Sequence, residues 1–258
     1  MQQTRNQSAP RPSDAPEAYV PGPDADRVLI FGSGPAVGWG VLTNEIALPG
    51  SLARALSLRT GRGTNVELVA DMRITVRNAL PMLRAIDTSQ FDVIVVVLGA
   101  NDAVKLLPLP TWREQLSAVL SSLDQKTSGQ SRTFVTAIPP VETIPGFASR
   151  LGRIVAAHAL QMNDVTARLC DSSNATFVPL PAVEPKNALG VRDGQTYRKW
   201  AATIADIIVP QLDELKSLKE IRALEMNYLV VEIRRELVER TIDERLLVNV
   251  VNAAALLE

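Results

Sequence analysis

The stretch from Asp92 to Leu98 (DVIVVVL), followed at once by Gly99-Ala100-Asn101-Asp102, decides the fold class of this 258-residue chain. Every residue after Asp92 in this stretch is apolar, and most are β-branched. Such a strand is typical of a parallel sheet that helices cover on both faces. The polar residues that follow it would lie at the carboxyl end of the strand, where open α/β sheets bind their ligands.

Shorter runs of the same kind alternate with stretches of helical pattern along the chain. Strands are expected at 27–32, 65–70, 92–98, 132–138 and 176–180, and helices near 48–61, 75–87, 111–125, 147–171 and 196–217. Alternation of this kind indicates βαβ units with right-handed crossovers. The sequence therefore predicts an α/β fold with a flavodoxin-like, doubly wound parallel sheet of five strands and a C-terminal helical extension.

Two terminal segments differ in composition from this α/β region, which spans 26–212. Residues 1–25 are rich in Pro, Ser, Asp and Gln, so we expect a disordered tail. Residues 213–258 are expected to form one or two amphipathic helices that must bury an apolar stripe, either on their own domain, in a homodimer seam or on a partner protein. The stripe comprises Leu212, Leu215, Leu218, Ile221 and Leu224.

The composition narrows the location and the possible partners. A formal net charge of -1 gives no basic field for nucleic acid or an anionic membrane surface, so we expect neither as a partner. The first residues contain no apolar signal core and no apolar run spans a bilayer, which predicts a cytoplasmic protein. A single cysteine, Cys170, excludes an internal disulfide and is expected to be a buried thiol. We expect no cofactor and no metal.

Two glycine-containing blocks resemble the SGNH/GDSL hydrolases. The first strand runs into Phe31-Gly32-Ser33-Gly34-Pro35-Ala36-Val37-Gly38, and the third runs into Gly99-Ala100-Asn101-Asp102. That family has G-D-S-x-x-x-G and G-x-N-D at these places, and the resemblance covers roughly 27–210. It implies a serine nucleophile, an oxyanion hole made by two backbone amides and an asparagine side chain, and a D-x-x-H block that supplies the base.

Matched to that pattern, the first block lacks the attacking oxygen. Gly34 stands where the family has its nucleophilic serine, Ser33 stands where it has aspartate, and Gly38 keeps the final glycine. Sliding Ser33 onto the nucleophile position breaks the spacing to Gly38. We expect Ser33 to be a helix N-cap or a loop hydrogen-bonding residue instead.

The second block, Asp71-Met72-Arg73-Ile74-Thr75, and the fifth block, which begins at Arg192-Asp193, are altered as well. Arg73 stands where the family has an oxyanion-hole glycine, and its side chain is expected to occupy the space of the substrate and to seek an anion or a carboxylate, with Asp193 as one candidate. Asp193 keeps the aspartate of the fifth block, but Thr196 replaces the histidine. Asn101 and Asp102 are retained in the third block, where we expect them to bind the backbone of their loop.

The sole histidine, His158, lies within an expected helix and does not follow a strand, so we expect a packing role for it. No catalytic residue is then intact, and the positions Ser33, Gly34, Arg73, Asn101, Asp193 and Thr196 are vestigial. The first hypothesis is a catalytically inactive scaffold that binds a protein or a small ligand. The ligand candidates are Gly32, Ser33, Gly34, Arg73, Asn101, Asp102 and Asp193.

Two alternatives remain open. One is an active esterase that uses Ser33 or a rearranged site, as the resemblance to ester hydrolases implies. The other is a nucleotide-binding module, in which Gly32-x-Gly34-x-x-x-Gly38 opens a helix that holds a phosphate and Asp71 meets a ribose hydroxyl.

Overall fold

The computed structural model describes residues 10–140, 150–183 and 193–255. In the last of these ranges, the side chains of 234 and of 236–255 are not described. The chain divides into two compact units, Met1–Leu215 and Lys216–Glu258. We call them the core unit and the C-terminal unit.

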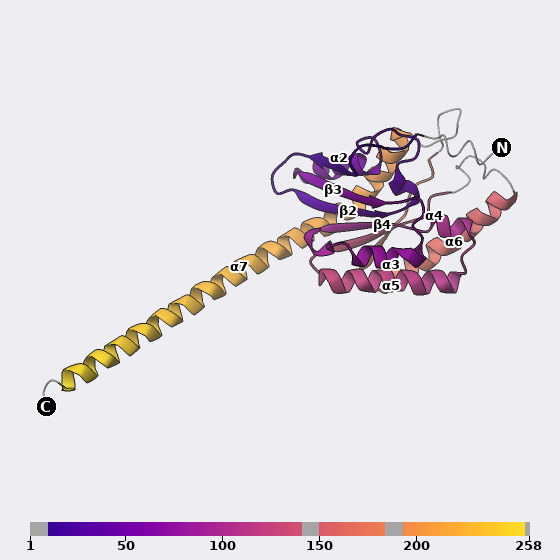
Figure 1. Cartoon of the computed structure of the whole chain (residues 1–258). Coiled ribbons are helices and arrows are strands. Elements are labelled where there is room, and N and C mark those ends of the chain that lie inside the picture. The colour runs from indigo at the N-terminus through magenta and orange to yellow at the C-terminus, as the bar shows by residue number, and fades with distance from the viewer. Residues whose placement is uncertain (1–9, 141–149, 184–192, 256–258) are drawn as a thin grey trace. The chain divides into compact units, whose positions relative to one another are not determined.

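A six-stranded sheet forms the centre of the core unit (Figure 1). Its strands lie in the order β1-β3-β2-β4-β5-β6, and all neighbours pair in parallel except β1 and β3. The five parallel strands have the flavodoxin-like order that the sequence predicts, so the fold class is confirmed. The strands are β1 (Glu17–Val20), β2 (Asp26–Gly32), β3 (Thr64–Ala70), β4 (Val93–Val97), β5 (Arg132–Thr136) and β6 (Ala175–Val178).

Helices cover both faces of the sheet. One face packs against α2 (Leu48–Thr60) and the first part of α7 (Gly194–Ala255), and the other packs against α3 (Val76–Arg84), α5 (Leu109–Thr127) and α6 (Arg150–Asp171). Shorter helical turns follow the strands or connect the elements: η1 (Gly34–Val37), η2 (Thr88–Gln90) and α4 (Ala100–Val104).

The central strands supply both halves of the core because successive side chains point to opposite faces. In β2, Phe31 packs with the α3, α5 and α6 side, whereas Ile30 packs with the α2 and α7 side. In β4, Val96 and Val95 divide in the same way. This double burial explains why the runs of β2 and β4 are apolar without alternation.

The expectation of a disordered tail over 1–25 is wrong for the described part of that segment, residues 10–25. Asp14 accepts hydrogen bonds from the backbone amide of Asn44 at 2.9 Å and from its side-chain amide at 3.0 Å. The segment then forms β1, which adds a sixth strand antiparallel to β3. Composition alone missed these contacts because the partners are distant in sequence. Residues 1–9 lie outside the described residues.

The last helix is a single element, in contrast to the separate helices expected for 196–217 and for the extension. Leu212 and Leu215 of the expected apolar stripe are buried in the core unit, whereas Leu218, Ile221 and Leu224 of the C-terminal unit are exposed. No helix in the described part of the chain is long and apolar enough to cross a membrane.

Candidate functional site

The first-block loop leaves the sheet where β2 and β4 run side by side. Ser33 donates its backbone amide to the carbonyl of Val97 at 2.8 Å. Gly32 has a φ of 143°, and a Cβ at this position would lie 1.9 Å from the Val97 carbonyl oxygen. Glycine is therefore required at position 32 by the close approach of two strands, which is a structural reason for this part of the motif.

The hydroxyl of Ser33 in this loop is buried, and Gly34 has no side chain. Gly34 has a φ of 59°, and a Cβ there would lie 3.0 Å from the Cβ of Ala100. Ser33 is 1% exposed, and its Oγ has no hydrogen-bond partner among the described residues. Ser33 occupies the N-cap position of η1, one of the two places expected for it, but its side chain makes no capping hydrogen bond.

The second-block loop is held by an internal ion pair. The guanidinium of Arg73 donates to both carboxylate oxygens of Asp71, at 3.0 and 2.9 Å, and the Arg73 backbone amide donates to the same carboxylate at 2.7 Å. These hydrogen bonds lower the pKa of Asp71 to about 2. Arg73 therefore binds a carboxylate, as expected, but that of Asp71 and not that of Asp193. Its side chain is 88% exposed and does not fill a substrate pocket, contrary to expectation.

Asn101 fastens the third block to the second. Its side-chain amide donates to the carbonyl of Met72 at 2.6 Å and to that of Ile74 at 2.8 Å. A primary amide has two N–H donors, and both are used here. Asn101 therefore binds the backbone of another loop, and not its own as expected, and it has no donor left for an oxyanion.

Asp102 is buried and supports the start of α3. Its carboxylate accepts the backbone amide of Val76 at 3.2 and 3.3 Å, one of the amides at a helix N-terminus that lack an intrahelical partner. Burial raises the pKa of Asp102, and the hydrogen bond from Val76 opposes that effect. Like Asn101, Asp102 therefore binds a backbone group outside the loop that follows β4.

The fifth-block pair forms a helix cap. The Asp193 carboxylate accepts the backbone amide of Thr196 at 2.9 Å and its hydroxyl at 3.1 Å. Thr196 is the third residue of α7, so this is the geometry of an N-cap aspartate. The spacing D-x-x-T was visible in the sequence and could have predicted the cap. A threonine hydroxyl has no basic group that could activate a nucleophile near pH 7.

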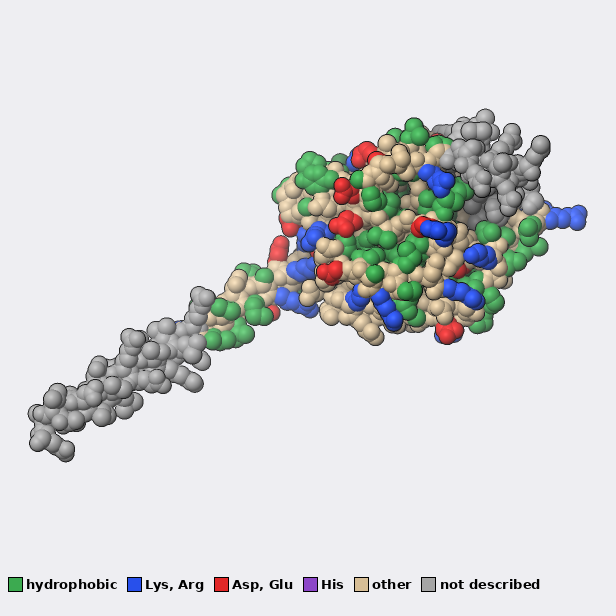
Figure 2. Space-filling model, viewed as in Figure 1, with side chains coloured by type: hydrophobic (Ala, Val, Ile, Leu, Met, Phe, Trp, Pro, Cys, Tyr) green, Lys and Arg blue, Asp and Glu red, His purple; other side chains and the backbone are tan. Residues whose placement is uncertain are grey.

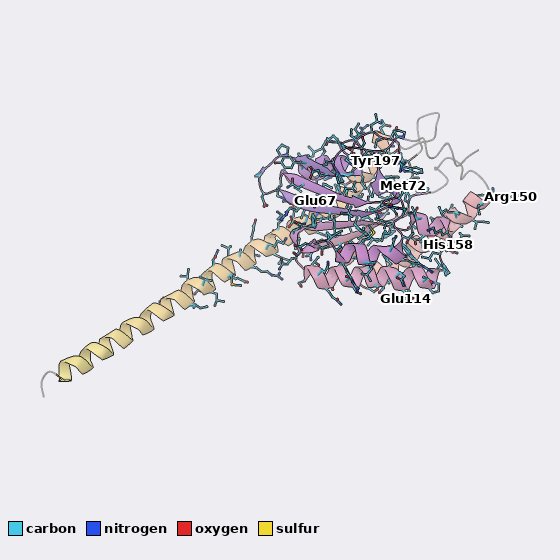
Figure 3. The ribbon with its side chains drawn as sticks, viewed as in Figure 1. Glu67, Met72, Glu114, Arg150, His158 and Tyr197 are labelled. Atoms are coloured by element: carbon cyan, nitrogen blue, oxygen red, sulfur yellow. The ribbon has the colours of Figure 1, made fainter. Side chains whose placement is uncertain are left out.

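His158 and Cys170 lie on α6 and have structural surroundings. The Nε2 of His158 lies 2.8 Å from the carbonyl oxygen of Leu107, so it donates a hydrogen bond there. Figure 3 labels His158 on α6 and Tyr197 on α7, and these helices cover opposite faces of the sheet. Cys170 is buried, which raises the pKa of its thiol to about 11. Neither side chain lies in the loops where the resemblance places the nucleophile and the base.

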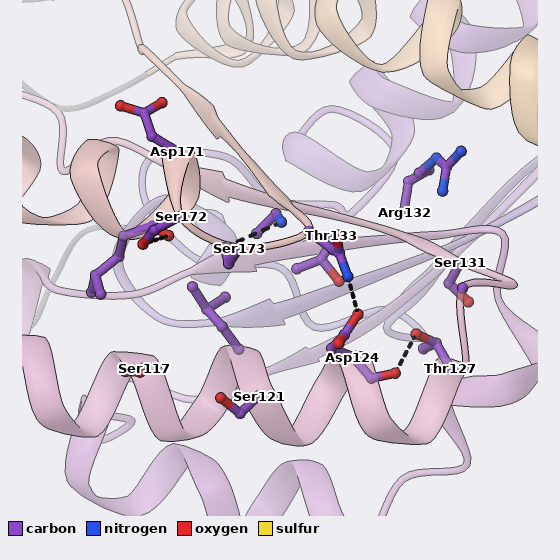
Figure 4. Close-up of a pocket in the computed structure, with 15 residues that line it drawn as sticks. Ser117, Ser121, Asp124, Thr127, Ser131, Arg132, Thr133, Asp171, Ser172 and Ser173 are labelled. Carbon is purple, nitrogen blue, oxygen red and sulfur yellow. Dashed lines mark hydrogen bonds between the residues drawn. The ribbon is translucent and has the colours of Figure 1, made fainter.

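Two hollows bounded by the described residues do not gather the expected site residues. A hollow of about 610 Å³ lies between residues 11–16 and the second-block loop, and its lining includes Asp71 and Arg73 but not Ser33, Gly34 or Asn101. A second hollow, of about 670 Å³, lies at the other edge of the sheet, where β5 and β6 begin (Figure 4). Many of its lining residues carry hydroxyl groups, including Ser117, Ser121, Thr127, Ser131, Thr133, Ser172 and Ser173.

The structure does not provide the phosphate cradle that the nucleotide hypothesis requires. The glycine-rich segment opens η1, which is four residues long, and not the N-terminus of a full α-helix. Asp71 is paired with Arg73. Among the described residues, no three His, Cys, Asp or Glu side chains gather in a group that could hold a metal ion.

Two of the residues that organise this region, Asp14 and Asn44, were not among the candidates, and Asp71 was one only in the nucleotide alternative. Asp14 and Asn44 join the N-terminal segment to the loop after η1, and Asp71 determines the direction of Arg73. Asp71 follows a strand directly, which is a weak signal for a site residue. The pairing of Asp14 with Asn44 left no signal in the sequence.

Comparisons with known proteins extend the assignment of the fold. No family model and no curated protein matches the sequence. Solved structures do match. The carbohydrate acetylesterase Est24 from Sinorhizobium meliloti superposes with a TM-score of 0.56 at 17% identity, and the match covers 72% of this chain and 99% of the Est24 chain. A lipase/acylhydrolase from Enterococcus faecalis has a TM-score of 0.59 at 17% identity, with coverages of 72% and 96%. TesA has a TM-score of 0.57 at 13% identity, with coverages of 72% and 99%. Identities this low show a shared fold and nothing further. The chain therefore has the SGNH/GDSL hydrolase fold.

Proposed function

We propose that this chain is a non-catalytic protein of SGNH hydrolase fold that serves as a binding scaffold. The observation that carries the proposal is the state of the oxyanion donors. Two of the three donors that the resemblance implies, the Arg73 amide and the Asn101 side chain, are already bonded to acceptors of the protein itself. A hydrolase needs such donors aimed at the position of the developing oxyanion.

The nucleophile and the base support the same proposal. Gly34 has no side chain to attack an ester, and Thr196 has no basic nitrogen. In serine hydrolases, loss of triad residues lowers kcat by roughly 10⁴ to 10⁶. Without catalysis, binding is the function that we propose, and the C-terminal unit is the candidate surface for another protein chain.

Hydrolysis of short p-nitrophenyl esters tests the proposal directly. The full chain and the Ser33→Ala variant should both show only the background rate. Ser51→Ala is the matched control, because Ser51 is also a buried serine of the core unit and makes a hydrogen bond to a backbone carbonyl. Ester hydrolysis that disappears in Ser33→Ala but survives in Ser51→Ala would establish the active-esterase alternative and refute the proposal.

A restoration experiment tests whether the oxyanion site is closed. The triple variant Gly34→Ser, Arg73→Gly, Thr196→His supplies a nucleophile, a second-block glycine and a histidine. It leaves Asn101 with both of its acceptors, so no gain in ester hydrolysis is expected. A gain would mean that the Asn101 amide can leave Met72 and Ile74, which contradicts the closed site even if the natural chain is inactive.

A further inference from the structure

The C-terminal unit exposes large apolar side chains along its helix. Tyr228 is 70% exposed and Leu224 is 69% exposed, and several of these side chains are visible in Figure 2. Soluble proteins seldom expose contiguous apolar surface of this kind unless it meets a partner. The exposed members are Leu218, Ile221, Leu224, Met226, Tyr228, Leu229, Val230, Val231 and Ile233.

This apolar segment has helical periodicity and is flanked by charges of opposite sign. Met226, Val230 and Ile233 follow one another at spacings of four and three, so they form a row along the helix. Residues 216–222 contain three basic side chains and one acidic one, and residues 238–244 contain three acidic side chains and one basic one. The two windows lie at equal distances from Val230.

This distribution of charge specifies how two copies of the helix can pair. A parallel, in-register pair would place the basic window on the basic window and the acidic window on the acidic window. An antiparallel pair centred on Val230 places each basic window beside an acidic one and superimposes the apolar segments. Charges that flank an apolar seam decide both the partner and the orientation of paired helices.

We propose that the C-terminal unit binds the same helix of a second copy of this chain in antiparallel orientation, with the pairing centred on Val230. The proposal goes beyond the non-catalytic function and does not depend on it, because the seam includes no residue of the core unit. Ester hydrolysis by the chain would leave it unaffected.

Charge reversal in the full chain tests the seam. The basic-window variant carries Lys216→Glu, Lys219→Glu and Arg222→Glu. In an antiparallel pair of this variant, residues 216–222 of one copy, now acidic, would lie beside the unchanged acidic window of the other copy. Light scattering after size exclusion should show the natural chain at twice the mass of a monomer, and this variant close to the mass of a monomer.

The acidic-window variant carries Glu239→Lys, Asp243→Lys and Glu244→Lys. Alone, it should also be a monomer, because both windows are then basic. A chain with both sets of reversals has the two windows exchanged, so an antiparallel pair regains opposite charges and association should return. Measurements at low ionic strength keep the charge effects large, since the Debye length grows from roughly 10 Å at 0.1 M salt to roughly 30 Å at 0.01 M.

Cross-linking checks the orientation. Lys216→Cys and Glu244→Cys variants, prepared separately and mixed under mild oxidation, should give a disulfide-linked pair of one copy of each. Lys216→Cys alone should give little linked product, because the two positions 216 lie at opposite ends of the seam. A monomeric natural chain, association that ignores the charge variants, or efficient linkage of Lys216→Cys to itself would each overturn the proposal.

Discussion

Removal of the Asn101 side chain should cost stability, because its contacts are those of a structural clamp. Asn101→Ala removes two hydrogen bonds to the carbonyls of Met72 and Ile74. A typical intramolecular hydrogen bond contributes about 0.5–1.5 kcal/mol net, so the loss should be about 1–3 kcal/mol. For a domain of this size, a loss of about 2 kcal/mol lowers Tm by roughly 4–8 °C.

Thermal unfolding followed by tryptophan fluorescence measures this change in the core unit, where all three tryptophans lie. Asn174→Ala is the matched control, because Asn174 makes one exposed hydrogen bond, to Asp124 at 2.8 Å. Surface changes of this kind usually stay within about 0.5 kcal/mol. If Asn101→Ala unfolds at the same temperature as the control, the clamp does not hold the second-block loop and the reasoning is refuted.

Asn101→Asp extends the same test to pH. Near pH 7 the carboxylate would place negative charge beside two carbonyl oxygens and would donate no hydrogen bond, so it should destabilise more than alanine. The folded state favours the protonated acid, which has one donor, and therefore raises the pKa of the new group. The stabilisation is present below the unfolded pKa of about 3.9 and is lost as the pH rises through the folded value. A variant whose Tm relative to Asn101→Ala does not improve on acidification would contradict this.

Three further results are expected. Native Cys170 should resist a thiol reagent at pH 8 and react fully once the chain is unfolded, because burial raises its pKa to about 11; rapid native modification would show that the thiol is accessible. Arg73→Gly should return the pKa of Asp71 from about 2 towards its ordinary value near 3.9 in an NMR titration. The natural pair therefore stabilises the fold above about pH 4, and this stabilisation is lost as the pH falls towards 2. An unchanged titration would exclude Arg73 as the cause of the low pKa. Gly34→Ala should lower Tm more than Gly61→Ala, since both glycines have left-handed φ angles but only an added Cβ at position 34 meets another group within 4 Å; equal losses would mean that Ala100 moves away freely.

The parallel sheet was predictable because its signals are local. The run from Val93 to Val97 is apolar on both faces, and that pattern reports burial between two layers of helices. Strand β1 gave no such signal, since it has four residues and Ala18 alone is buried. Its place in the sheet depends on pairing with β3, whose partner residues lie 44 to 50 positions later in the chain, and composition does not encode that pairing.

Matching the sequence to the motif shows which motif residues are absent, but it does not show which contacts the retained residues make. The absence of a serine at position 34 and of a histidine at position 196 can be seen by matching residues to a motif. The role of Asn101 could not be, because its partners are backbone carbonyls, and their direction depends on how the second-block loop folds. The exposed conformation of Arg73 was missed for a different reason: the prediction weighed a distant acceptor, whereas the partner, Asp71, lies only two residues away.

The short strand β1 also determines which edge of the sheet is open to pairing with other chains. By pairing with residues 64–67, it occupies backbone N–H and C=O groups that would otherwise form a bare edge on β3. Bare edges of this kind are templates for aggregation between molecules. Shortening the protein at residue 25, as its composition would suggest, should therefore yield a chain that is less soluble despite losing mostly polar residues.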